Sequence, residues 1–137
     1  MTLTTGLNHV ATLTSDMDRT VRFYQEAFEA TVTFEVAKTD DHPWMKIVDL
    51  GGGAALNIFE ASAAEIIGER RRQGRRGAID HFALAVASLA DLEVVKTRLA
   101  AAGAQEVGDI QRLGSEWSLF FRDPDGMELE VCCRVEN

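Results

Sequence analysis

Two histidines and one glutamate are the residues of this chain whose types best suit metal chemistry. His9 and His81 lie in two similar stretches, GLNHVATLTS at 6–15 and AIDHFALAVA at 78–87, and Glu130 lies in DPDGMELEV at 123–131. Two imidazoles and a carboxylate form a suitable ligand set for a divalent metal such as Fe, Mn, Co, Ni or Zn. The sequence therefore predicts one metal ion held by three residues that are far apart along the chain.

An internal repeat indicates which elements must position these residues. A shift of 72 positions (81 − 9) places His9 on His81, and the apolar strand after each histidine aligns without a gap. A helical pattern follows in each copy, at 16–29 and at 88–102, with Ser15 or Asp16 capping the first helix and Ser88 the second. Further strands are expected at 31–37, 44–50 and 54–60, and again at 104–107, 116–122 and 127–133.

The repeat predicts an α+β fold of two tandem βαβββ modules. We expect one domain over residues 1–137, because a chain of this length that is 46% hydrophobic can bury a core without disulfides. The first module spans about 6–60 and the second about 79–133. A polar connector at 61–78 joins them, and its beginning could hold a short helix.

Strand alternation suggests which residues surround the metal. His9, Ala11 and Leu13 share one face of the first strand, and Glu128, Glu130 and Cys132 share one face of the last. The repeat pairs Asn57 with Glu130, since Asn57 follows His9 by 48 residues and Glu130 follows His81 by 49. Asn57 can be a weak metal ligand or only a pocket-lining amide. The residues predicted to line the substrate pocket are Asn57, Phe59, Trp117 and Glu128.

Charge and composition exclude several classes of partner. The net charge of −8 argues against nucleic acid, and no apolar run is long enough to span a membrane. The run ERRRQGRR at 69–76 is interpreted as a solvated linker, or as a lip that attracts an anionic substrate. Cys132 and Cys133 are neighbours that point to opposite faces, which fits a reducing, cytoplasmic compartment.

Three segments give the chain a family resemblance: NHVATLTSDMDRTVRFYQEAF, IDHFALAVASLADLEVVKTRLAAAGA and FFRDPDGMELEV. The chain resembles the vicinal oxygen chelate superfamily, which includes glyoxalase I, bleomycin-resistance and fosfomycin-resistance proteins, extradiol dioxygenases and methylmalonyl-CoA epimerase. The resemblance implies that the curved mixed sheets of the two modules form a pseudo-barrel around a cavity. It further implies a homodimer, and a metal that binds adjacent oxygens of a small molecule and stabilises an oxyanion or enolate. It also implies that Glu130, after the D-P-D-G turn, is the metal glutamate.

Single residues separate the chain from each of these activities. Asn57 stands where glyoxalase I has a glutamate and the epimerase a glutamine. Phe120 stands where dioxygenases have a tyrosine, and Ala11 where fosfomycin enzymes have a threonine. We therefore expect a metal-dependent enzyme of the glyoxalase type, with lyase, isomerase and dioxygenase chemistry all open. The alternatives are a drug-sequestering protein of the bleomycin-resistance kind and a noncatalytic metal-binding module.

Overall fold

The computed structural model describes residues 3, 5–66 and 81–136. The arginine-rich run at 69–76 and most of the predicted connector lie outside these described residues. The chain divides into two compact units, Met1–Ile67 and Gly68–Asn137.

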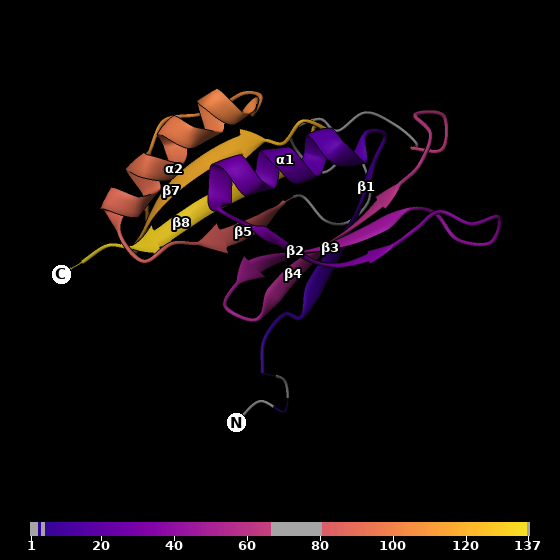
Figure 1. Ribbon diagram of the computed structural model, residues 1–137. Coiled ribbons are helices and arrows are strands. Elements are labelled where there is room, and N and C mark those ends of the chain that lie inside the picture. Colours follow the sequence, from indigo (N-terminus) through magenta and orange to yellow (C-terminus); the bar gives the residue numbers. More distant parts are fainter. Residues whose placement is uncertain (1–2, 4, 67–80, 137) are drawn as a thin grey trace. The chain divides into compact units, whose positions relative to one another are not determined.

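The first unit is a four-stranded mixed sheet with one helix (Figure 1). Its strands follow the spatial order β1-β4-β3-β2, in which β1 runs parallel to β4 and the other neighbours are antiparallel. The elements are β1 His9–Thr14, α1 Met17–Phe28, β2 Thr31–Val36, β3 Met45–Gly51 and β4 Ala54–Glu60.

The second unit repeats this topology. Its strands follow the order β5-β8-β7-β6, again with one parallel pair, β5 with β8. The elements are β5 Phe82–Ala85, α2 Leu89–Ala102, β6 Gln111–Leu113, β7 Glu116–Arg122 and β8 Glu128–Arg134. The predicted α+β fold of two βαβββ modules is therefore confirmed, with two separate four-stranded sheets that do not close into a barrel.

Both helices begin with a side-chain cap. Asp16 accepts a hydrogen bond from the backbone N–H of Arg19, and Ser88 accepts one from that of Asp91. Both helices end in a left-handed residue, which is Gly103 after α2 but Glu29, at φ 56°, after α1. A glycine is the usual residue there because it has no Cβ to clash with the backbone.

Each sheet uses one face for the core. In the first unit Leu56, Ile58 and Val48 are buried together with the apolar side of α1, including Tyr24. In the second unit α2 contacts β7 and β8, so that its apolar stripe covers one face of that sheet. The buried residues of this second core are Leu92, Leu99, Leu119, Phe121, Leu129 and Val131. Each such side chain contributes about 1.5–3 kcal/mol through burial. Because the core occupies one face of each sheet, the opposite face is available to polar side chains.

Two elements differ from the sequence prediction. Residues 104–107 do not form a strand: Gln105 makes one isolated bridge to Arg122, and Glu106 has a left-handed backbone at φ 49°. The strand that joins this edge of the sheet is instead Gln111–Leu113, which pairs with β7. The beginning of the connector forms a turn in which the N–H groups of Glu65 and Ile66 reach the carbonyl of Ser62.

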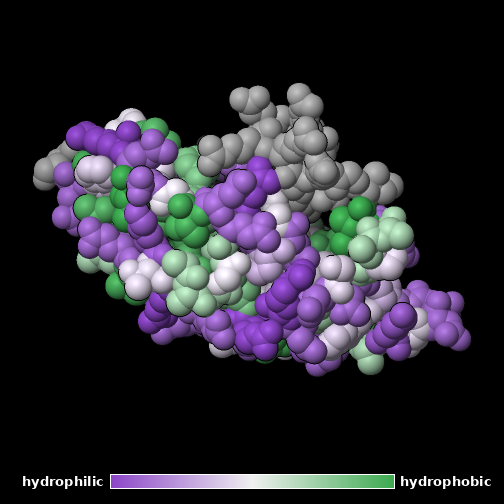
Figure 2. All heavy atoms as spheres, turned by 90° about the horizontal axis from the view of Figure 1, so that it is seen from above, coloured by the Kyte–Doolittle hydropathy of each residue, from purple (hydrophilic) through white to green (hydrophobic). Residues whose placement is uncertain are grey.

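Hydrophilic side chains cover much of the face seen in Figure 2, and apolar side chains are scattered among them. In the described part of the chain, neither helix has the length and apolar character needed to cross a membrane.

Candidate metal centre

His81 and Glu130 meet in the second unit. His81 directly precedes β5, and Glu130 lies in β8, beside β5 in the sheet. Nε2 of His81 is 3.2 Å from Oε2 of Glu130, and their side chains are 30% and 14% exposed. Without a metal, the imidazole N–H donates to the carboxylate. A divalent cation would replace that proton, because it uses the same nitrogen and oxygen lone pairs.

The other oxygen of Glu130 has a different partner. The hydroxyl of Ser118, on β7, donates to Oε1 of Glu130 at 2.5 Å, and Ser118 is only 1% exposed. Sequence reasoning did not find this contact. The alternation in EWSLFFR does place Ser118 on the polar face of β7, but only the pairing of β7 with β8 brings it to Glu130.

Phe120 packs against the imidazole of His81. The ring centroids are 5.3 Å apart with an interplanar angle of 79°, an edge-to-face arrangement that aromatic rings favour. In the strand register Phe120 is directly opposite Glu130. Since phenylalanine has no hydroxyl, this position contributes ring orientation rather than an acid or base.

His9 is an exposed residue at the start of β1, in the first unit. Its Nδ1 lies 2.7 Å from Oδ1 of Asn8. An amide oxygen can only accept, so Nδ1 carries the proton in this arrangement and Nε2 keeps a free lone pair. Nε2 is therefore the nitrogen that His9 offers to a metal.

Asn57 occupies the position in the first sheet that Glu130 occupies in the second. It faces Ala11 on β1, two residues after His9, just as Glu130 faces Ala83 on β5, two residues after His81. The Oδ1 atom of Asn57 is buried and has no hydrogen-bonding partner within the described residues. A buried amide oxygen without a donor is unusual, so Asn57 suits a contact with a ligand or a cation.

Phe59 lines a cavity of about 360 Å³ in the first unit. Leu13 and Pro43 add apolar surface to it, whereas Lys38 and His42 add polar groups. The ring of His42 lies 6.3 Å from that of Phe59. Phe59 thus lies at an open cavity whose lining combines apolar side chains with several charged ones.

Trp117 and Glu128 lie on opposite faces of the second sheet. Trp117 pairs with the buried Cys133, on the face covered by α2, and so does not share a face with Glu130. The sequence prediction had placed Trp117 in the pocket, but the register places it beside the core. Glu128 does share the face of Glu130, opposite Arg122.

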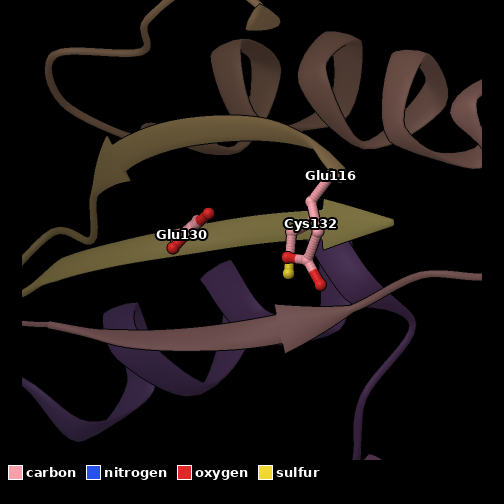
Figure 3. Close-up of side chains that lie close together, drawn as sticks. All are labelled: Glu116, Glu130 and Cys132. Atoms are coloured by element: carbon pink, nitrogen blue, oxygen red, sulfur yellow. The ribbon is translucent and has the colours of Figure 1, made fainter. Parts of the chain in front are cut away.

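A second cluster of possible ligands lies beside Glu130. Glu116, Glu130 and Cys132 carry ligand atoms that all lie within 4.8 Å of one another, and Figure 3 shows Glu116 next to Cys132. Burial, followed by the hydrogen bond to Glu116 and its charge, raises the pKa of Cys132 to about 11. The thiol is therefore protonated at neutral pH and is a poor nucleophile.

The fold and the site together define a class of protein. Two βαβββ units, each with a histidine at its first strand and a polar residue opposite on its last, form the framework of the vicinal oxygen chelate proteins. The chain belongs to the Glyoxalase/Bleomycin resistance protein/Dioxygenase superfamily, whose family model matches residues 6–131.

Several relatives are similar over nearly the whole chain. The metallothiol transferase FosB of Shouchella clausii (strain KSM-K16) is 30% identical over 136 residues, covering 92% of this chain and 78% of FosB. A glyoxylase/bleomycin resistance protein/dioxygenase domain from Frankia sp. EAN1pec has a TM-score of 0.79 at 28% identity, covering 96% of this chain and 99% of that domain.

A third comparison is with a liganded structure. A single-residue mutant of the fosfomycin resistance protein FosX from Listeria monocytogenes, complexed with Mn(II) and 1S,2S-dihydroxypropylphosphonic acid, has a TM-score of 0.71 at 21% identity. The match covers 94% of this chain and 92% of that chain. At this level of identity the likeness establishes the shared fold.

Proposed function

We propose that this protein is a metal-dependent enzyme that binds two adjacent oxygens of a small molecule on a divalent cation. The observation that carries the proposal is the pairing of His81 Nε2 with Glu130 Oε2 at 3.2 Å. This nitrogen and oxygen lie on one sheet face and are mostly shielded from water, as protein ligands of a catalytic metal are. His9, whose Nε2 has a free lone pair, supplies the third ligand in this proposal.

The residues present fit a divalent ion. The imidazole of His81 and the carboxylate of Glu130 are both ligand types that Mn, Fe, Co, Ni and Zn accept. A set of three protein ligands leaves positions for two substrate oxygens, and the bound ion supplies Lewis-acid stabilisation of negative charge on them. The protein itself orients the side chains that would bind the metal. Phe120 orients His81 in this way, because its ring packs against the imidazole.

The comparisons support a small oxygen-rich substrate. The ligand in the Listeria structure is a phosphonic acid with two adjacent hydroxyls, and the Shouchella relative is a metallothiol transferase. We therefore propose fosfomycin and related phosphonates as the first substrates to test, with water or a thiol as the second reactant. Ala11 still separates this chain from the fosfomycin enzymes, so a related substrate of different shape fits the proposal equally well.

Elemental analysis of protein purified without added metal tests the ligand set. Wild type should hold divalent metal at about one ion per chain, whereas His9→Ala, His81→Ala and Glu130→Gln should hold much less. Glu128→Gln is the matched control. Glu128 lies on the same face of β8 as Glu130, but its partner in the strand register is Arg122. Equal metal content in wild type and the three ligand variants would refute the proposal.

Turnover is then measured with metal-loaded protein. Phosphorus NMR follows fosfomycin in the presence of water alone and of a low-molecular-weight thiol. Wild type should convert the substrate, and Glu130→Gln should not. Metal binding without turnover of any phosphonate would move the proposal to another substrate class, whereas turnover by Glu130→Gln at the wild-type rate would contradict the assigned role of Glu130.

A further inference from the structure

We propose that Ser118 is a positioning residue, which fixes the Glu130 carboxylate so that Oε2 is the oxygen offered beside His81. The inference rests on the proposed function, in which Glu130 binds the metal. It adds a residue that lies outside the metal-ligand set and acts through Glu130.

The first support is that the two oxygens of Glu130 have separate partners. Ser118 donates its hydroxyl proton to Oε1 at 2.5 Å, and His81 lies 3.2 Å from Oε2. A carboxylate held at one oxygen cannot rotate freely about its terminal torsion. It therefore presents a single, defined oxygen to a cation instead of alternating between one-oxygen and two-oxygen binding.

The second support is burial. Ser118 is 1% exposed and the side chain of Glu130 is 14% exposed, so water has little access to replace the hydroxyl. Ser118 also sits on a rigid element: β7 pairs with β8 along the whole length of both strands. Its position opposite Cys132 makes the contact to Glu130 a diagonal one across the two strands, which the register fixes.

A purely structural hydroxyl would have a different effect. Its loss would lower the free energy of unfolding and leave the metal affinity unchanged. The loss of a positioning hydroxyl lowers the metal affinity itself. Removing a hydrogen bond that holds a metal ligand in place weakens metal binding about 10- to 100-fold. The two roles are therefore separated by measuring stability and metal affinity on the same variants.

The test uses full-length protein and Mn²⁺, with the dissociation constant taken from the electron paramagnetic resonance signal of free Mn²⁺. Ser118→Ala should bind Mn²⁺ about 10- to 100-fold more weakly, and Ser118→Thr, which keeps the hydroxyl, should restore most of the affinity. Thr20→Ala is the matched control. It removes another buried hydroxyl, bonded to Thr14 at 2.8 Å in the first unit, and should leave the affinity unchanged.

A spectroscopic measurement adds a second readout. With Co²⁺ in place of Mn²⁺, the visible absorption of Ser118→Ala should differ from that of wild type, because the ligand field changes when Glu130 reorients. The spectra of Ser118→Thr and Thr20→Ala should match wild type. If Ser118→Ala does not fold, Ser118→Cys replaces it, since a thiol has nearly the same shape and donates only weakly.

The outcomes separate the two proposals. Weaker Mn²⁺ binding in Ser118→Ala, with rescue by Ser118→Thr, supports the positioning role. Equal Mn²⁺ affinity in wild type and Ser118→Ala, together with loss of binding in Glu130→Gln, overturns the role of Ser118 and leaves the proposed function intact. Absence of Mn²⁺ binding in wild type overturns both.

Discussion

Asn57 and Glu130 hold the same place in the hydrogen-bonding registers of the two sheets. Asn57 lies opposite Ala11 on β1 and Ile47 on β3, and Glu130 lies opposite Ala83 on β5 and Phe120 on β7. The position that carries a charged ligand candidate in the second unit thus carries a neutral amide in the first. The duplicated fold has kept the geometry while the chemistry of the two positions has diverged.

The buried oxygen of Asn57 makes Asn57→Leu a stabilising substitution. Oδ1 has no partner within the described residues, and a buried unpaired acceptor costs about 1–3 kcal/mol. Leucine is close in size and carries no polar atom, so urea denaturation should show a free energy of unfolding about 1 kcal/mol higher. Binding of substrate should weaken in the same variant. Thr14→Val, which removes a hydroxyl bonded to Thr20, serves as the contrast and should lower stability. Lower stability in Asn57→Leu would mean that the amide has a structural partner.

The contact between Asn8 and His9 predicts a tautomer effect on metal binding. Oδ1 of Asn8 accepts from Nδ1 of His9 and keeps Nε2 free for a cation. Asn8→Ala removes this acceptor and should weaken Mn²⁺ binding about tenfold or more. Asn8→Asp retains an acceptor oxygen at the same place and should bind about as well as wild type. Titration calorimetry compares the two variants, and equal weakening in both would argue against a tautomer effect.

The thiol of Cys132 predicts a specific pH dependence of stability. Its pKa is raised from 9.0 to about 11, chiefly by burial and then by the hydrogen bond to Glu116. Between these values the folded protein keeps a proton that the unfolded chain has lost, so the stabilising contribution is complete below pH 9 and disappears as pH rises toward 11. Urea denaturation of wild type and Cys132→Ser across this range measures it.

Variants of Cys132 and Glu116 should change the pH dependence of stability in different ways. Wild type should lose stability more steeply than Cys132→Ser between pH 9 and 11. Glu116→Gln should lower the pKa of Cys132, because it removes the negative charge beside the thiol. The pH range over which stability falls should therefore be narrower in this variant. Identical pH profiles for wild type and Cys132→Ser would contradict the prediction.

The end of α1 offers a backbone prediction. Glu29 adopts a left-handed conformation at φ 56°, which costs a residue with a Cβ about 1–2 kcal/mol. Glu29→Gly should raise the free energy of unfolding by about 1 kcal/mol, since part of the gain is offset by the greater freedom of glycine in the unfolded chain. Thermal denaturation measures the effect.

Gly103 provides the control at the end of α2. Its φ is 94°, and a Cβ at this position would meet no described atom within 4 Å beyond its neighbours along the chain. Gly103→Ala therefore introduces only backbone strain and should destabilise the protein. A loss of stability in Glu29→Gly would show that the Glu29 side chain makes contacts that outweigh its conformational strain.

The sequence by itself determined the elements and the repeat. Helix periods, caps and strand alternation depend on residues close together in the chain, so β3, β4, β7, β8 and both helices fall within a residue or so of the predicted bounds. The pairing of Asn57 with Glu130 also followed from sequence, because two copies of one module place equivalent residues at equivalent positions. The repeat likewise paired His81 with His9, whereas Glu130 was predicted as a ligand from strand alternation and from the D-P-D-G resemblance.

Tertiary structure decided which side chains meet. Alternation divides a strand into two faces, but the register of distant strands decides which face of β7 meets which residue of β8. That register placed Trp117 beside Cys133, brought Ser118 to Glu130 and located the edge strand at Gln111–Leu113 instead of 104–107. Strand pairing is a contact between residues far apart in the chain, and no local pattern of residues encodes it.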